Sequence, residues 1–295
     1  MTILTDRLQE KRILVSDGAW GTMFASQGLE PGEAPERWNL GHPEKVLEVA
    51  GAYVAAGSDI ILTNTFGASP FKLERLGLAD KTETVNRRAA ELSKEAAAGR
   101  ALVFASIGPT GEFLAPLGPR TNDEMIAAFS RQAKGLAEGG ADGVVIETFT
   151  DINEAKAALA AVKRTCDLPA IVSMTFDKGP AGFATMMGVK PEQAASELTA
   201  AGADAVGSNC GAGIEQMTEV AALMRGATDA PLWFKPNAGL PELEGGETVY
   251  RETPEAMAEK LAGLIEAGAA IVGGCCGTTP GHIELFAQRV KEIVS

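Results

Sequence analysis

The chain has 295 residues, of which 45% are hydrophobic, a fraction typical of a soluble globular protein. Its net charge of −13 disfavours binding to nucleic acid and to anionic membranes. The first twelve residues lack the apolar stretch of a secretory signal, and the longest apolar runs are far shorter than the roughly 18 residues of a membrane span. We therefore expect a soluble, cytoplasmic protein that binds neither nucleic acid nor membrane.

Eight short apolar runs recur along the chain, and each is followed by a loop and a helical pattern. They span residues 13–16, 59–63, 102–106, 143–146, 170–174, 205–208, 232–235 and 270–273. Most are rich in Val, Ile and Leu and show no polar alternation, which is typical of strands buried on both faces. This pattern predicts a parallel sheet covered by helices.

The segments between these runs predict helices. Residues 122–139 begin with Asn and acidic residues and then place apolar side chains on one face, and residues 254–268 open with Pro-Glu and end on Gly. Similar glycine-containing segments precede strands 2, 4, 6 and 8, where glycine closes the preceding helix. This recurrence favours a single-domain α/β fold over residues 1–295, a (β/α)8 TIM barrel, with an open doubly wound sheet as the alternative.

In such a barrel the active site lies at the carboxyl ends of the strands. Three of the four cysteines fall at such ends: Cys210 follows the sixth strand, and Cys275 and Cys276 follow the eighth. The tandem pair stands between glycines, where the chain can turn and both sulfurs can face one point. Cys166 precedes the fifth strand, so we expect it at the opposite end of the barrel without a role in the site.

Three thiolates around one centre form a soft site that selects zinc, with one exchangeable position as in catalytic zinc sites. Because three thiolates give the ion a net charge near −1, such a centre is poorly suited to activating water. It suits a substrate thiol, whose proton the metal removes while the sulfur stays electron-rich. The cysteines therefore predict a zinc enzyme that alkylates a thiol.

Six motifs carry a resemblance to a known family. They are DGAWGT at 17–22, TNTFGA at 63–68, IGPTG at 107–111, IETF at 146–149, NC at 209–210 and GGCCGTTP at 273–280. In this order, over nearly the whole chain, they resemble the homocysteine S-methyltransferase family. The resemblance implies a (β/α)8 barrel, zinc bound by Cys210, Cys275 and Cys276, and homocysteine as the methyl acceptor, its thiolate becoming the fourth ligand.

The resemblance also implies which residues bind substrate. They are Asp17, Gly18, Ala19, Asn64, Thr65, Glu147, Asn209 and Asn237. Among them, Glu147 is expected to hold the amino group of homocysteine, and the turn 17–19 with its backbone amides to receive the carboxylate. Asn237 is the candidate for the fourth zinc ligand when substrate is absent.

Two positions of the sequence bear on the identity of the methyl donor. Betaine-using family members place tyrosines beside the equivalents of Phe66 and Glu147, where their faces cage the quaternary ammonium; here the neighbours are Gly67 and Thr148. These residues resemble the homocysteine module of cobalamin-dependent methionine synthase, which implies methylcobalamin as donor. Since the chain ends at Ser295 without a cobalamin domain, we expect the corrinoid on a separate protein.

Alternatives stay open at this point. Trp20 offers one aromatic face, so betaine, S-methylmethionine or another onium compound could be the donor. A non-catalytic subunit that binds homocysteine or docks a corrinoid protein is a further alternative. The sequence leaves the oligomeric state open, and a monomer is compatible with it.

Three other features have simpler interpretations. His42 and His282 both stand near helix starts, and we expect structural or surface positions for them. The polar excursion 30–38 is expected to be a loop, with a lid over the site as the alternative. The acidic stretch 243–247 predicts an exposed turn.

Overall fold

The structure is a computed structural model that describes residues 2–245 and 247–295. Eight parallel strands form one sheet in the spatial order β1-β12-β9-β8-β5-β4-β3-β2. They are β1 (Leu14–Val15), β2 (Ile60–Ile61), β3 (Leu102–Ile107), β4 (Gly143–Phe149), β5 (Ala170–Met174), β8 (Ala205–Gly213), β9 (Leu232–Asn237) and β12 (Ala269–Val272).

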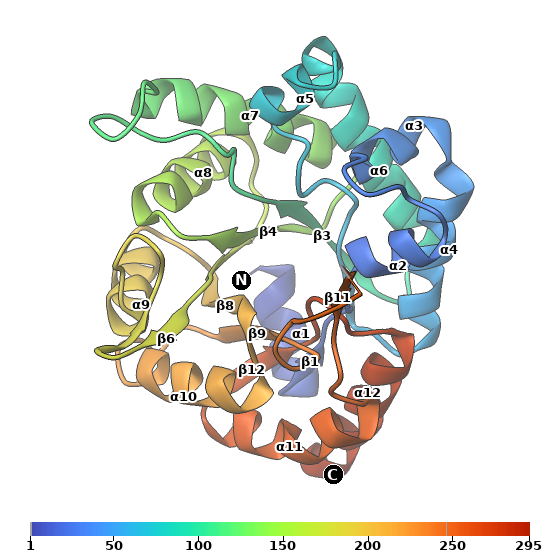
Figure 1. The fold of residues 1–295 in the computed structure, drawn as a ribbon, viewed down its shortest axis with the longest axis vertical. Coiled ribbons are helices and arrows are strands. Elements are labelled where there is room, and N and C mark those ends of the chain that lie inside the picture. Colours follow the sequence, from blue (N-terminus) through green and yellow to red (C-terminus); the bar gives the residue numbers. More distant parts are fainter. Residues whose placement is uncertain (1, 246) are drawn as a thin grey trace.

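The sheet closes on itself. A parallel bridge between Ser16 and Ile60 joins the two outermost strands, and the amide of Asp59 donates to the carbonyl of Val15 at 2.7 Å. The strands thus form a ring with helices outside it, as Figure 1 shows. The predicted (β/α)8 TIM barrel is confirmed, and the open sheet is excluded.

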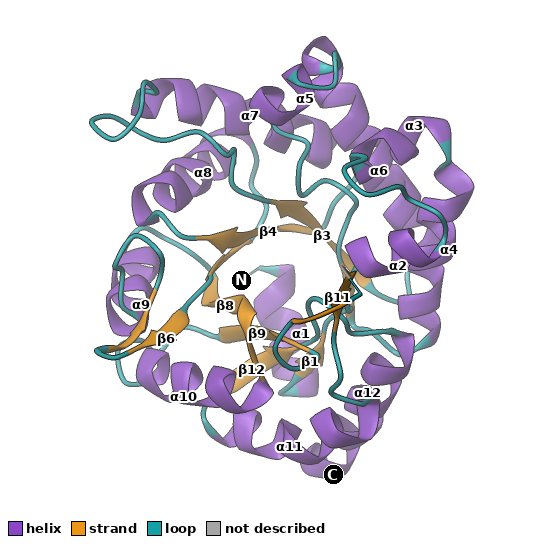
Figure 2. Ribbon diagram, in the orientation of Figure 1, coloured by secondary structure: helices purple, strands orange, loops and turns teal. Residues whose placement is uncertain are grey.

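Helices surround the ring of strands (Figure 2). The long outer helices are α4 (Pro43–Ala55), α6 (Thr82–Ala97), α7 (Asn122–Glu138), α8 (Ile152–Thr165), α9 (Pro191–Ala200), α10 (Ile214–Arg225), α11 (Pro254–Glu266) and α12 (Pro280–Val294). The remaining ones are α1 (Ile3–Lys11), α2 (Gly21–Ser26), α3 (Trp38–Gly41), α5 (Pro70–Glu74) and the 3-10 turns η1 (Pro35–Arg37) and η2 (Ala79–Lys81). Within the described ranges, no helix has the length and apolar character needed to cross a membrane.

The predicted elements agree with the observed ones. Each of the eight apolar runs overlaps a strand, and the helices predicted at 122–139 and 254–268 end within two residues of α7 and α11. The glycines before strands 2, 4, 6 and 8 have positive φ, namely Gly57, Gly140, Gly202 and Gly268. The structure adds two hairpins that the sequence did not predict, β6–β7 (Asp177–Gly179, Gly182–Ala184) and β10–β11 (Glu242–Glu244, Glu247–Val249).

In the acidic stretch 243–247, residues 243–244 belong to β10 and residue 247 to β11, and residues 243–245 are exposed, as predicted. Gly246 lies outside the described residues. His42 is a half-exposed partner of Glu44, and buried His282 caps α12 and contacts the carbonyl of Glu252 at 3.0 Å. Both histidines have the structural or surface positions expected of them.

The interior of the barrel is apolar at its amino end. One or two buried side chains from most of the strands form a single cluster, and Leu4 of α1 also belongs to it. The cluster consists of Leu4, Leu14, Ile60, Leu62, Leu102, Phe104, Val145, Ile171, Ala205, Trp233 and Ile271. Because this end is filled, we expect a site at the opposite end of the barrel.

Candidate metal and substrate site

A layer of buried polar side chains lies above the apolar interior. Residues two apart on a strand point to the same side, and several interior apolar residues are followed two positions later by a polar one. These pairs are Phe104–Ser106, Val145–Glu147, Ile171–Ser173 and Trp233–Lys235. The strand periodicity therefore places a set of polar groups at the carboxyl end of the barrel.

Three cysteines meet at the rim of this layer. The sulfurs of Cys210, Cys275 and Cys276 all lie within 4.8 Å of one another, and those of Cys210 and Cys276 are 3.9 Å apart. Zinc–sulfur bonds of about 2.3 Å in a tetrahedron would place the sulfurs about 3.8 Å apart. The donor set and its spacing thus fit a soft metal ion, and the predicted cysteine cluster is present.

Local backbone geometry brings the sulfurs together. Cys210 and Gly211 lie within β8 and have φ values of 62° and 66°, at the point where the pairing of β8 with β9 shifts register between Asn209 and Gly213. The strand is therefore irregular at Cys210. The loop of the tandem pair is held against β9, because the amide of Cys275 donates to Pro236 O at 2.8 Å. Cys166 ends α8 at the opposite end of the barrel, as expected.

Without metal, the three thiols share their protons unequally. Hydrogen bonds from Cys275 and Cys276 lower the pKa of Cys210 to about 3. The hydrogen bonds to Cys210 have the opposite effect on the two donating thiols. They raise the pKa of Cys276 to about 11 and that of Cys275 above its ordinary value. The thiols therefore hold their protons unevenly, and a metal ion that binds all three as thiolates displaces the protons that remain.

Each cysteine also has a neighbouring side chain that can donate to its sulfur. Asn209 Nδ2 lies 3.9 Å from Cys275 Sγ. The side chain of Asn237 contacts Cys210, and the Tyr250 hydroxyl contacts Cys276. Burial, together with Cys276, raises the pKa of Tyr250. Such donors orient metal-binding thiolates and offset part of their charge.

Beside the cysteines lies a buried cluster of one base and two acids. Lys235 Nζ donates to Asp17 Oδ1 at 2.6 Å, with side-chain exposures of 3% and 0%. Burial lowers the pKa of Lys235, but the charges of Asp17 and Glu147 outweigh it and raise the pKa overall. Burial raises the pKa of Glu147, against the opposing effects of Lys235 and of a 2.5 Å hydrogen bond from Ser106.

The turn 17–19 packs tightly against the cysteine loop. A Cβ on Gly18 would lie 2.8 Å from both Thr278 Oγ1 and Tyr53, so only glycine fits there. The amide of Asp17 donates to Ile60 O at 3.0 Å, and that of Ala19 to Thr278 Oγ1 at 3.1 Å. Two of the three backbone amides expected to receive the substrate carboxylate are therefore already bonded within the protein.

Three other residues predicted to bind substrate also use their polar groups internally. Asn64 Nδ2 donates to Pro35 O at 2.7 Å, and Thr65 Oγ1 to Ser106 O at 2.6 Å. Asn209 Oδ1 accepts from the amide of Thr148 at 2.9 Å. All three residues line the cavity, and these bonds hold its wall in place.

Comparison with known proteins gives this arrangement a context. Residues 14–290 match the model of the family described as homocysteine S-methyltransferase. The chain belongs to the homocysteine S-methyltransferase family. It is an enzyme of this family, and its cysteine cluster is a candidate metal site.

Curated relatives include the methionine synthases of Mycobacterium leprae and Mycobacterium tuberculosis. They are 32% and 31% identical to this chain over 97% and 99% of its length. The chain spans about a quarter of each relative, 25% and 26%. The metallated form of the homocysteine methyltransferase MmuM from Escherichia coli superposes with a TM-score of 0.82 at 24% identity, covering 97% of this chain and 99% of that one. That likeness shows the fold.

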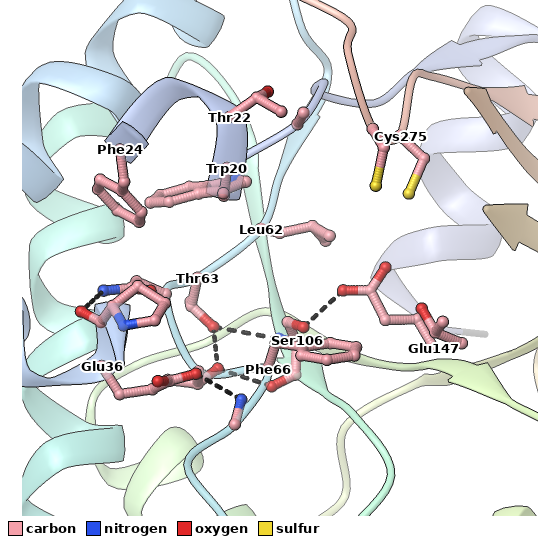
Figure 3. A pocket seen from close by; sticks show the side chains of 18 of the residues that line it. Trp20, Thr22, Phe24, Glu36, Leu62, Thr63, Phe66, Ser106, Glu147 and Cys275 are labelled. Atoms are coloured by element: carbon pink, nitrogen blue, oxygen red, sulfur yellow. Dashed lines mark hydrogen bonds between the residues drawn. The ribbon is translucent and has the colours of Figure 1, made fainter. Parts of the chain in front are cut away.

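In this family member the cysteines open into a cavity of about 660 Å³. Figure 3 shows Cys275 and Glu147 on one side of it, with Trp20, Phe24 and Glu36 on the other. The excursion 30–38 supplies part of the second side, since Gly32 and residues 34–36 line the cavity. This segment, expected to be a loop or a lid, is a wall of the cavity.

Glu36 on this wall explains why position 67 is glycine. Its carboxylate is 4% exposed and accepts from the Gly67 amide at 2.6 Å. A Cβ on Gly67 would lie only 2.6 Å from Glu36 Oε1. Burial raises the pKa of Glu36. A larger side chain at position 67 would force this carboxylate to move.

Sequence reasoning missed four residues of the site: Ser106, Lys235, Tyr250 and Glu36. The first two could have been found by continuing the inward alternation of Phe104 and Trp233 by two positions. Tyr250 lies on a loop and Glu36 in the short turn η1, where no periodicity indicates the direction of a side chain.

Proposed function

We propose that the protein is a zinc-dependent enzyme that methylates homocysteine to methionine, with methylcobalamin as the methyl donor. The cluster of three sulfurs within 4.8 Å, opening into the cavity, is the observation that carries this proposal. Cys210, Cys275 and Cys276 would hold the ion. When bound, zinc supplies a means of keeping the substrate thiol deprotonated at neutral pH.

The residues of the chain then position homocysteine. Glu147 would accept its ammonium group, and the turn 17–19 would lie beside its carboxylate. Because Glu147 and the turn 17–19 are buried, charges there are screened less than they would be in water. The homocysteine sulfur gains the methyl group, and the electron pair of the broken donor–methyl bond stays on the donor.

Asn237 is proposed as the fourth metal ligand when homocysteine is absent. It is buried at the end of β9, and its side chain contacts Cys210. Its Oδ1 atom is buried without a hydrogen-bond partner among the described residues. An acceptor left unpaired in a polar site suits a ligand that an incoming substrate sulfur displaces.

Positions 67 and 148 support methylcobalamin over betaine. Glu36 fills the space that an aromatic ring at position 67 would need. Thr148 has a φ of 65° and is bound through its hydroxyl to Asn209 at 2.7 Å. The corrinoid would reach the open end of the cavity on a carrier, which we propose is a separate corrinoid protein.

A small onium donor is a second candidate, because Trp20 and Phe66 line the cavity opposite the cysteines. Aromatic faces attract cationic ligands. A donor screen at fixed homocysteine separates the two candidates. We expect zinc-loaded protein to form methionine from methylcobalamin and not from betaine or S-methylmethionine. Methionine formation from an onium compound alone would reverse the choice of donor.

A further inference from the structure

Lys235 is a buried ammonium whose hydrogen bonds are only partly used by the protein. Its Nζ donates to Asp17 Oδ1, and the residues of the described ranges supply no second acceptor. An ammonium group carries three N–H donors. Since Lys235 lines the cavity, two donors remain for whatever occupies it.

The two neighbouring carboxylates differ in how fully they are used. Asp17 accepts from Lys235 on one oxygen and, at 2.7 Å each, from Trp20 Nε1 and the Leu62 amide on the other. Within residues 2–245 and 247–295, Glu147 accepts one hydrogen bond, from Ser106, on Oε1. A carboxylate has about four acceptor positions, so Glu147 can take a further donor, whereas Asp17 serves mainly to hold Lys235.

The site therefore offers a buried acceptor at Glu147 and buried donors at Lys235 within one charged cluster, since the two side chains act on each other's charge. An α-amino acid presents the complementary pair, an ammonium and a carboxylate on one carbon. Because the Asp17 and Ala19 amides are bonded within the protein, the turn 17–19 offers this carboxylate at most the Gly18 amide.

We propose that Lys235 binds the α-carboxylate of the thiol substrate and thereby selects an amino acid over a simple thiol. The proposal rests on the proposed function and adds to it the group that recognises the carboxylate. Asp17 acts as a positioning residue, because its carboxylate fixes Lys235 Nζ at the cavity wall.

The test compares three thiols for binding to zinc-loaded protein by calorimetry: homocysteine, 3-aminopropane-1-thiol, which lacks the carboxylate, and 4-mercaptobutanoate, which lacks the amine. Lys235→Met should weaken binding of homocysteine and 4-mercaptobutanoate by roughly 10- to 150-fold, as expected for a lost hydrogen bond to a charged group. Binding of 3-aminopropane-1-thiol should change by less than about threefold.

Glu147→Gln is the matched variant, with the opposite expectation. It should weaken binding of the two amine-bearing thiols and leave binding of 4-mercaptobutanoate unchanged. Equal losses for all three thiols in Lys235→Met, at unchanged zinc content and thermal stability, would overturn the assignment of Lys235. Should Lys235→Met fail to fold, Lys235→Gln, which keeps a donor for Asp17, replaces it. The same comparison of losses in binding of the three thiols then applies. Wild-type protein that bound none of the thiols would instead refute the proposed function.

Discussion

The two sides of the cavity are built in different ways. The side that carries the cysteines, Glu147 and Lys235 consists of the carboxyl-terminal parts of β4, β8 and β9 and of the loop that follows β12. The side that carries Glu36 and Phe66 consists of loops and short turns after β1 and β2. Under the proposed function, the barrel itself would hold the thiol substrate, whereas the loops would shape the space for the donor.

The largest expected effect comes from breaking the strand-end side at its metal ligands. Cys210→Ser should reduce bound zinc from about one ion per chain to a small fraction and abolish methyl transfer. Losing several kcal/mol of stabilisation from the metal corresponds to at least about a thousandfold in rate. Metal analysis and methionine formation measure both effects, and Cys166→Ser, at the opposite end of the barrel, should change neither. Retained zinc and activity in Cys210→Ser would contradict the assigned site.

A smaller effect on the same side should follow from Asn237→Ala. If Asn237 is the fourth ligand, zinc affinity in the absence of homocysteine should fall by about 10- to 100-fold, the range seen when residues supporting a metal site are removed. With homocysteine bound, the affinity should be nearly that of wild type. Chelator competition measures both values. An equal loss in both states would mean that Asn237 only donates to Cys210.

The loop side can be disturbed without touching the metal. Gly67→Ala places a methyl group against Glu36 and should cost about 1–3 kcal/mol of unfolding free energy, as overpacking does. Gly21→Ala is the matched control on the same side, because nothing lies within 4 Å of its Cβ position. Denaturant unfolding measures the cost. A loss of zinc in Gly67→Ala would show that the two sides are not independent.

The smallest expected effect concerns the buried Glu36 carboxyl. Because burial raises its pKa in the folded protein, the unfolded chain ionises first as pH rises past the ordinary value of 4.5. Wild type should therefore lose stability relative to Glu36→Gln as pH rises from 4.5 until the folded carboxyl has ionised too. Unfolding curves at several pH values test this, and a constant difference between the proteins would contradict it.

The sequence predicted the barrel well because its periodicity is strong. Eight apolar runs and the glycines before alternate strands reflect burial and helix closure, which act locally. The hairpins β6–β7 and β10–β11 were not predicted, since they are short and their strands are mostly exposed. Apolar periodicity carries no information about such segments.

The cysteine cluster was also predictable, because tandem thiols at a strand end leave few other interpretations. The partners of the charged groups could not be predicted from the sequence. Asp17, expected at the substrate, is the buried partner of Lys235, a contact across 218 residues that no local pattern encodes. Asn64 and Thr65 resemble site residues in sequence, but their polar groups are bonded within the wall.

The central claim is that homocysteine binds through its sulfur at the three cysteines. X-ray absorption of the zinc-loaded protein tests it most directly, by counting the atoms around the metal with and without homocysteine. We predict three sulfur neighbours and one oxygen or nitrogen in the free protein, changing to four sulfur neighbours when homocysteine is added. An unchanged set of neighbours at saturating homocysteine would contradict the account.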